Sequence, residues 1–294
     1  MTTVEIEFRK QEMKDLLCYN NIPSDNLILK DNPYILKYHR PPTGSFAACV
    51  NSMKLLHCET ANFWTHFLPA VLAVLCIISN FLSYPLSFIK HDFDWDVLTT
   101  QDRILLSLGV FGITVCFGTS SMFHVFCTHS RWSKLFNQFD LMAVMFMLTC
   151  LAISISYFKF ANTDTYLVIA FELVVGTISI KTVASLTDAN AKGFRVIVYS
   201  FSIFLLWLPC LFSIYLNTHV QVDYNTKNLV LQSISCAILG GIFYASKIPE
   251  KILPGYFDLI GSSHMWMHVF TSFAAFYMYE AILMTATFRY ELST

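Results

Sequence analysis

The sequence predicts an all-α membrane protein with seven transmembrane helices. Of its 294 residues, 55% are hydrophobic and 13% are charged, whereas about 25% of the residues in a typical soluble domain are charged. The mean hydropathy is +0.53. The apolar residues also gather in seven blocks, each with a length near that of a membrane-spanning helix. These blocks cover residues 63–81, 104–126, 139–158, 165–186, 194–216, 229–245 and 264–285.

Charge and cysteine content argue against several other classes of protein. The net charge of −1 gives no electrostatic basis for binding nucleic acid. The nine cysteines are scattered, several of them within apolar blocks, and no C-x-x-C pair occurs, so we expect small core residues rather than a redox or metal motif. The first 30 residues are polar and charged, which leads us to expect no cleavable signal peptide.

The blocks divide the chain into three expected parts. Residues 1–62 form a cytoplasmic N-terminal region, residues 63–286 form the seven-helix membrane domain, and residues 287–294 form a short C-terminal tail. Within the first part, prolines at both ends of residues 32–42 predict an extended strap. Residues 45–57 place apolar side chains at spacings near 3.6, which predicts a short amphipathic helix lying in the membrane interface.

The distribution of lysine and arginine predicts the orientation of the helices. If the N-terminus is cytoplasmic, 14 of the 19 Lys and Arg residues lie on the cytoplasmic side and 5 lie on the opposite side. Cytoplasmic loops of membrane proteins carry an excess of these residues. We therefore expect a cytoplasmic N-terminus and an extracellular or lumenal C-terminus.

Two histidines at the start of the last block suggest a metal site. His264 and His268 are four residues apart, so on a helix both imidazoles leave the same face and can bind one metal ion from one side. The alternative is a pair of hydrogen-bonded histidines at a helix end, among lipid headgroups. Because successive helices alternate in direction, the end of the second block and the starts of the third and seventh lie at one face of the membrane. His124 and Asp140 belong to that same face, and Ser120 lies one turn deeper than His124.

This combination of residues is typical of a catalytic zinc site. Three histidines leave one coordination position open, where zinc lowers the pKa of a bound water to roughly 7. Asp140 is the best-placed general base and then general acid, and Ser120 can hydrogen-bond to a substrate or to the water. Three unrelated histidines at the membrane interface remain the alternative reading of the same pattern.

Three further ionisable residues have weaker claims to function. His129 lies between two blocks, where a loop or capping role is favoured over metal binding. His66 belongs to the same face as His124 and is expected either behind the metal ligands or among lipid headgroups. Glu172 falls in the middle of the fourth block, where a bare charge is costly, so we expect it to be functional or else protonated and hydrogen-bonded.

Several segments together resemble the progestin and adipoQ receptor (PAQR) family, within the wider superfamily that includes alkaline ceramidases. The resemblance runs from about residue 33 to residue 280, nearly the whole membrane core. The matching segments read NPYILKYHR, ETANFWTHFLP, SSMFHVFCTHS and IPEKILPGYFDLIGSSHMWMH, with Asp140 between the last two. The chain departs from the family pattern at Lys37, where many members have glycine, and at Ser262, which replaces a histidine or glutamine. The amino-acid sequences of the second and fourth segments resemble the membrane progestin receptor branch more closely than the adiponectin receptors.

The resemblance implies a site and a fold. Members of the family have seven helices, a cytoplasmic N-terminus and a zinc ion held by three histidines. Carried onto this sequence, the zinc ligands are His124, His264 and His268, the acid–base carboxylate is Asp140, and the accompanying serine is Ser120.

Three hypotheses for function follow. The first is a receptor that binds a lipophilic ligand, either a steroid or a lipid, and signals across the membrane. The second is a zinc-dependent intramembrane amidase that hydrolyses ceramide-like lipids, and one protein can combine both activities. The third is a receptor in which zinc is purely structural. The plasma membrane is the expected location, with the Golgi and the endoplasmic reticulum as alternatives, and no effector protein is indicated.

Overall fold

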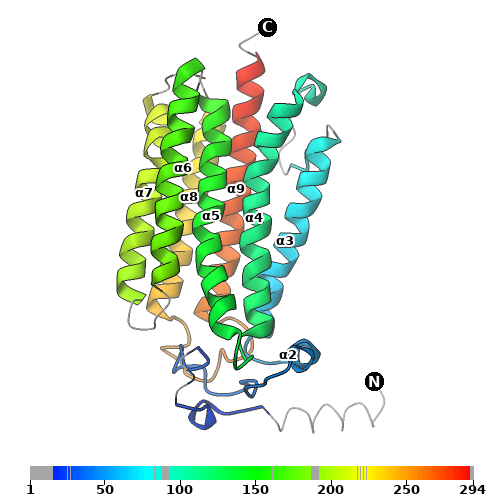
Figure 1. The fold of residues 1–294 in the computed structure, drawn as a ribbon, viewed down its shortest axis with the longest axis vertical. Helices are drawn as coiled ribbons and strands as arrows, with labels where there is room; N and C mark the ends of the chain where they lie inside the picture. The colour runs from blue at the N-terminus through cyan, green and yellow to red at the C-terminus, as the bar shows by residue number, and fades with distance from the viewer. Residues whose placement is uncertain are drawn as a thin grey trace. The chain divides into compact units, whose positions relative to one another are not determined.

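The computed structural model describes residues 16–24, 26, 28–82, 84–87, 93–160, 162–186, 192–216, 218, 220, 222 and 224–291. Over this part of the chain it contains eight α-helices and no β-strand, only isolated bridges. Seven of the helices are long and apolar enough to cross a membrane. Figure 1 labels the helices, which are α2 (Phe46–Ser52), α3 (Thr60–Phe81), α4 (Thr100–Phe126), α5 (Ser133–Lys159), α6 (Asn162–Ser185), α7 (Lys192–Leu216), α8 (Tyr224–Ser246) and α9 (Ser263–Glu291).

The seven predicted blocks are confirmed, and most of the helices extend beyond them. Helix α5 begins at Ser133, six residues before the apolar block at 139–158, and α9 runs to Glu291, into the predicted tail at 287–294. Residues 292–294 of that tail, and residues 1–15 of the N-terminal region, lie outside the described part of the chain. Apolarity marks the stretch buried in lipid, whereas polar turns at either end keep the helical hydrogen bonds. The apolar blocks therefore underestimate the lengths of the helices.

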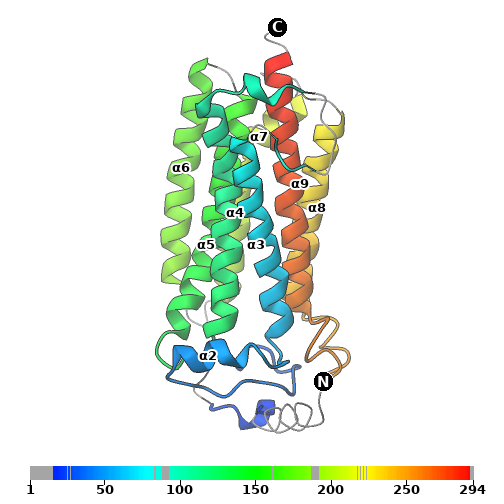
Figure 2. The same cartoon turned by 90° about the vertical axis from the view of Figure 1, so that its right-hand side faces the viewer.

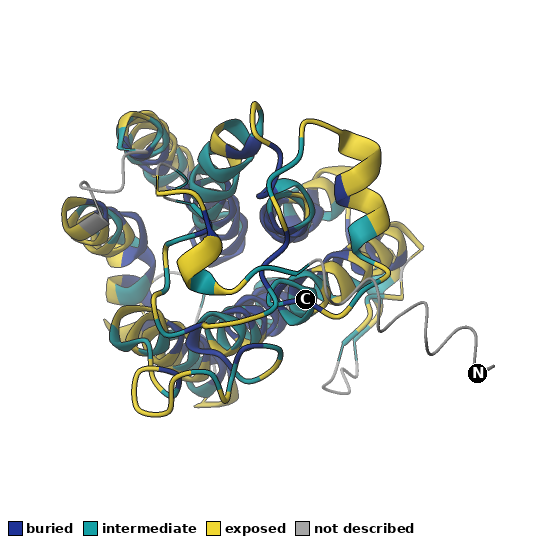
Figure 3. Cartoon of the chain, turned by 90° about the horizontal axis from the view of Figure 1, so that it is seen from below, coloured by how far each residue is buried: buried dark blue, intermediate teal, exposed yellow. Residues whose placement is uncertain are grey.

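Burial differs among the seven long helices. Within the most apolar stretch of each helix, 67% of the residues are buried in α5 and α9 and 56% in α4, compared with 22–33% in the other four helices. Figure 3 shows helices with buried residues on one side and exposed residues on another. Exposed apolar side chains on a long apolar helix are suited to contact with lipid. The three most buried helices, α4, α5 and α9, are also those that carry the predicted site residues.

The described chain divides into two compact units, and five of the long helices contribute to both. The first unit comprises Met1–Leu68, Gly118–Asp140 and Ile238–Thr271, and the second comprises Pro69–Phe117, Leu141–Ala237 and Ser272–Thr294. All five residues predicted for the site lie in the first unit.

The second unit contains a large apolar core with a few buried polar groups. Its fully buried apolar residues include Leu106, Ile113, Met145, Leu206 and Ile282. The Glu172 side chain is also fully buried, and the Ser156 hydroxyl donates a 2.7 Å hydrogen bond to it. Glu172 on α6 is thus hydrogen-bonded to a residue of α5, as one of the two expectations required, while its protonation stays a prediction.

The predicted strap is present in the first unit and is held by hydrogen bonds to the loop that precedes α9. The backbone amides of Leu36 and Lys37 donate to the Asp258 carboxylate at 2.9 and 3.0 Å. The Asn32 amide donates to Glu250 at 2.9 Å, and Glu250 accepts a 2.7 Å hydrogen bond from the backbone amide of Ser263, at the start of α9. The strap thus connects the N-terminal region to the helix that carries two of the predicted ligands.

The end of the strap is anchored to α4 by a buried arginine. The Arg40 side chain is 2% exposed. Its guanidinium donates to the backbone carbonyls of His124 and Val125, the second at 3.0 Å, and also to Ser52 and Cys127. The carbonyls of His124 and Val125 belong to the last turn of α4, which leaves them without partners inside the helix. A cation is electrostatically favourable at this end of a helix.

Part of the stretch 45–57 forms a helix, α2, which ends at Ser52, while its position in the membrane interface stays a prediction. Its N-cap is Ser45, which accepts a hydrogen bond from the backbone amide of Ala48. The Phe46 and Val50 side chains are exposed, while Cys49 is fully buried. Figure 2 shows α2 beside the lower end of α4, and the Phe46 and Phe126 rings lie 5.3 Å apart.

Candidate metal centre

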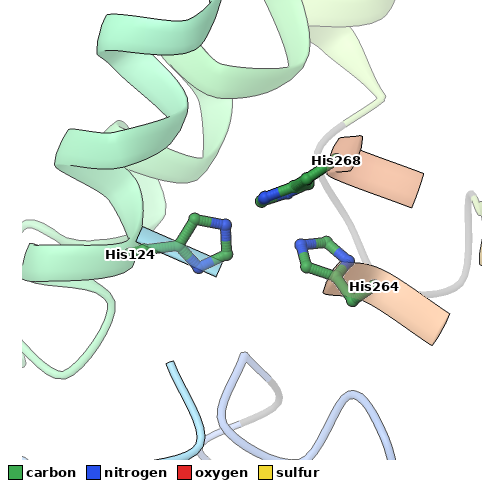
Figure 4. Close-up of side chains that lie close together, drawn as sticks. All are labelled: His124, His264 and His268. Atoms are coloured by element: carbon green, nitrogen blue, oxygen red, sulfur yellow. The ribbon is translucent and has the colours of Figure 1, made fainter. Parts of the chain in front are cut away.

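Three histidines from two helices meet in the first unit. His124 lies in the last turn of α4, and His264 and His268 lie in the first two turns of α9. One ring nitrogen of each lies within 4.8 Å of the corresponding nitrogens of the other two. Figure 4 shows the three rings around a common space. This spacing is close enough for the three side chains to hold one metal ion.

The hydrogen bonding of His124 leaves one nitrogen for a metal. Its Nδ1 lies 2.7 Å from a Glu59 carboxylate oxygen, so Nδ1 carries the proton and donates it. Nε2 then has the lone pair, and it is buried with no hydrogen-bond partner among the described residues. Buried polar atoms are normally paired. A metal ion between the three rings would pair this nitrogen, so the donor set fits a metal.

His268 is held in a similar way from behind. Its Nδ1 lies 3.1 Å from the backbone carbonyl oxygen of Asn62 and 3.2 Å from the Thr65 hydroxyl oxygen. Both contacts come from the first turns of α3. The His66 ring also stacks on the His268 ring, with centroids 3.6 Å apart and planes 10° apart. Nδ1 is thus the donor nitrogen, and Nε2 of His268 carries the lone pair.

Glu59 precedes α3 and stays ionised in this environment. Burial by itself would raise the pKa of the Glu59 carboxyl, but hydrogen bonds from the His124 ring and the Asn62 amide lower that pKa below its ordinary value. The Asn62 amide donates to the same oxygen as His124, at 2.9 Å. The carboxylate therefore keeps its charge next to the three histidines.

The predicted acid–base pair lies beside the histidines. The side chains of Asp140 and Ser120 are hydrogen-bonded to one another, and Asp140 lies near His124. Ser120 is buried and Asp140 is half-buried. The sequence placed Asp140 in the first turn of its helix, but α5 begins at Ser133, so Asp140 lies about two turns inside.

The other two candidate histidines also have defined places. His66 is buried against His268, which favours the expected position behind the ligands over exposure to headgroups. His129 is buried in the loop after α4, where its Nδ1 accepts a hydrogen bond from the backbone amide of Arg131 and its ring contacts Phe46. The loop role predicted for His129 is thus confirmed.

Sequence reasoning missed the residues that support the ligands. Asn62, whose residue type suits a helix N-cap, lies inside the first turn of α3. Its function in the site comes from its backbone carbonyl, which any residue type has. Glu59 is 65 positions from its partner His124, so no local pattern links them. The one available signal was an acidic residue at the start of an apolar helix, which is read more simply as a favourable charge at a helix N-terminus.

Comparison with known proteins assigns the family. Residues 54–279 match the family described as haemolysin-III related. The chain belongs to this family, which includes the progestin and adipoQ receptors. The family inferred from the motifs is thereby confirmed, while the closer relation to the membrane progestin receptor branch stays a prediction.

Similar proteins occur in distant animals. The chain is 30% identical over 279 residues to an adiponectin receptor protein of Drosophila melanogaster, covering 92% of this chain and 60% of that protein. It is 27% identical over 273 residues to progestin and adipoQ receptor-like protein 1 of Caenorhabditis elegans, covering 91% and 60%. It is 25% identical over 290 residues to progestin and adipoQ receptor family member 3 of Mus musculus, covering 94% and 88%. The chain thus spans about 60% of the length of the first two relatives.

Proposed function

We propose that this protein is a seven-helix membrane receptor for a lipophilic ligand, either a steroid or a lipid, with a zinc ion held by His124, His264 and His268. Two observations carry the proposal: one ring nitrogen of each histidine lies within 4.8 Å of the others, and Nε2 of His124 is buried without a hydrogen-bond partner among the described residues. Neutral imidazoles at this spacing suit zinc, which accepts three protein ligands and one further group. Membership of a family that includes proteins named as receptors supports the receptor role.

The metal content of the purified protein tests the zinc site. We expect about one zinc per chain, and we expect loss of that zinc in His264→Ala and His268→Ala. His129→Ala is the matched control, because His129 is a buried histidine of the same unit that lies in a loop. Stoichiometric zinc in both α9 variants would refute the ligand assignment.

A second candidate function is hydrolysis of the amide bond of a ceramide-like lipid. The observation that favours it is the hydrogen-bonded pair of Asp140 and Ser120 next to His124. A zinc ion bound by the three histidines supplies Lewis acidity to an amide carbonyl and to water. Asp140 then accepts a proton at its carboxylate and passes it to the nitrogen of the leaving amine, while Ser120 orients the carboxylate through their hydrogen bond.

Asp140→Asn separates the two functions. The variant is expected to keep the zinc ion, because Asp140 is not among the three ligands, and to lose all release of fatty acid from ceramide. If the wild type released fatty acid from ceramide no faster than the Asp140→Asn variant, the amidase function would be excluded. If neither protein released fatty acid while both bound the lipophilic ligand equally, the zinc would serve a receptor or a purely structural role.

The orientation belongs to the same proposal. The excess of Lys and Arg favours a cytoplasmic N-terminal region and an extracellular or lumenal C-terminus, which puts the three histidines near the cytoplasmic face. The plasma membrane is the proposed location. A tag after residue 294 should be cleaved by protease added to intact cells, and protection of the tag in cells with the protein at their surface would reverse the orientation.

A further inference from the structure

One stretch of eight residues contacts two of the three proposed ligands from behind. Glu59 and the first turns of α3, up to His66, provide every polar contact described for the Nδ1 atoms of His124 and His268. The Glu59 carboxylate accepts a hydrogen bond from Nδ1 of His124, and the backbone carbonyl of Asn62 accepts one from Nδ1 of His268. No hydrogen bond to the His264 ring occurs among the described residues.

A hydrogen bond at Nδ1 has two consequences for a histidine that binds metal through Nε2. It fixes the tautomer, because a neutral ring with its proton on Nδ1 has its lone pair on Nε2. It also fixes the rotation of the ring and makes Nε2 a stronger base, and the effect is largest when the acceptor is charged. The contact between Glu59 and His124, at 2.7 Å, has the length of a charge-assisted bond.

The surroundings of Glu59 keep its carboxylate aimed at His124. The Asn62 amide, one turn along, donates to the same carboxylate oxygen at 2.9 Å. That oxygen therefore accepts two hydrogen bonds, one from a residue on α3 and one from a residue on α4. The same Asn62 uses its backbone carbonyl for His268. The two ligands are thus oriented by one rigid helical turn.

We propose that Glu59 is a positioning residue of the metal centre, fixing the tautomer and the orientation of His124 while the backbone of Asn62 does the same for His268. The inference rests on the proposed zinc site and goes beyond it, because it assigns a function to a residue that does not touch the metal. It predicts that zinc affinity depends on a side chain 65 positions away from the ligand it supports.

Zinc affinity of the purified full-length protein, measured by competition with a chelator of known affinity, tests the inference. Glu59→Ala removes the acceptor and should weaken zinc binding by about 10- to 100-fold. Glu59→Gln keeps an oxygen that can accept from both His124 and Asn62 but removes the charge, so a smaller loss is expected. Asp102→Asn is the matched control, because it neutralises a buried carboxylate of the second unit, which accepts hydrogen bonds from Thr99, Tyr157 and Tyr290.

A double-mutant cycle distinguishes positioning from a general structural role. If Glu59 acts through His124, Glu59→Ala should cause no further loss of affinity in a His124→Ala background. The cobalt-substituted protein gives a second readout, because a rotated His124 ring should change the visible absorption bands in Glu59→Ala, whereas the bands of Asp102→Asn should match those of the wild type.

The outcomes separate this inference from the proposed function. A wild-type protein without any zinc affinity would overturn both. The positioning role alone would be overturned if Glu59→Ala bound zinc as tightly as the wild type. It would also be overturned if Glu59→Ala reduced zinc affinity by the same factor in the wild-type and His124→Ala backgrounds. A lower melting temperature with unchanged zinc affinity and unchanged cobalt bands would likewise assign Glu59 to the fold and overturn the inference.

Discussion

Replacing Arg40 by methionine should destabilise the protein and weaken the metal centre together. The Arg40 side chain is 2% exposed and donates to the last carbonyls of α4, including that of His124 itself. Methionine has a similar length and keeps much of the apolar packing, but it has no donor. The variant therefore leaves two buried carbonyls at the end of α4 without their partner.

The magnitude follows from the contacts that are lost. A hydrogen bond with a charged donor contributes about 1.5–3 kcal/mol, so the two backbone contacts contribute about 3–6 kcal/mol. Removing a buried cation returns part of the cost of its desolvation. We expect a net loss of about 3 kcal/mol in the free energy of unfolding. At about 2 °C per kcal/mol for a chain of this size, the melting temperature should fall by roughly 6 °C.

Thermal unfolding in detergent, followed by tryptophan fluorescence, measures this loss. Lys37→Met is the matched control, because Lys37 is an exposed cation three residues earlier in the same strap. A surface change of this kind should alter stability by no more than about 0.5 kcal/mol. If Arg40→Met melted at the temperature of Lys37→Met, Arg40 would not hold the end of α4, and the strap would have no part in placing His124.

Two further changes test the packing and the protonation of the fold. An added Cβ at Gly112 would lie 2.7 Å from a side-chain carbon of α5, whereas one at Gly118 meets nothing within 4 Å. Gly112→Ala should therefore cost about 1–3 kcal/mol in an unfolding titration, while Gly118→Ala should gain up to about 1 kcal/mol of helix propensity, and equal effects would refute this packing. Burial and the charge of Arg40 lower the pKa of His57 to about 3. Below about pH 6.5 the unfolded state binds a proton that folded His57 does not, so stability falls with pH between about 6.5 and 3 by up to about 1.4 kcal/mol per pH unit. His57→Asn should flatten the pH profile of unfolding over that range, and profiles parallel to that of the wild type would contradict the shift.

Much of the fold could be predicted because lipid imposes a single strong pattern. A spanning helix must be apolar over most of its length, so blocks such as 104–126 mark a helix without any knowledge of its neighbours. The ends of the helices were less predictable. The first two turns of α5 contain Ser133, Lys134, Asn137 and Gln138, and these polar residues form a helix that hydropathy does not detect.

The candidate ligands could be predicted because two of them are close in sequence. His264 and His268 share a helical face by their spacing alone, and the alternating direction of the helices brought His124 and Asp140 to the same end of the membrane. The support behind the ligands could not be predicted in this way. Glu59 and Arg40 reach α4 through contacts that join distant parts of the chain, and no periodicity encodes such contacts.

These supporting contacts change how the N-terminal region should be understood. Hydropathy separates residues 1–62 from the membrane helices, and that boundary remains a prediction about where the membrane begins. Packing groups the same region differently, because Met1–Leu68 forms one unit with the segments that carry all three histidines. Within that unit, Arg40 holds the end of α4 and Glu59 holds the ring of His124. The strap and the residues before α3 are therefore a structural part of the metal centre, so a ligand or partner that displaced the strap would act directly on the geometry of the histidines.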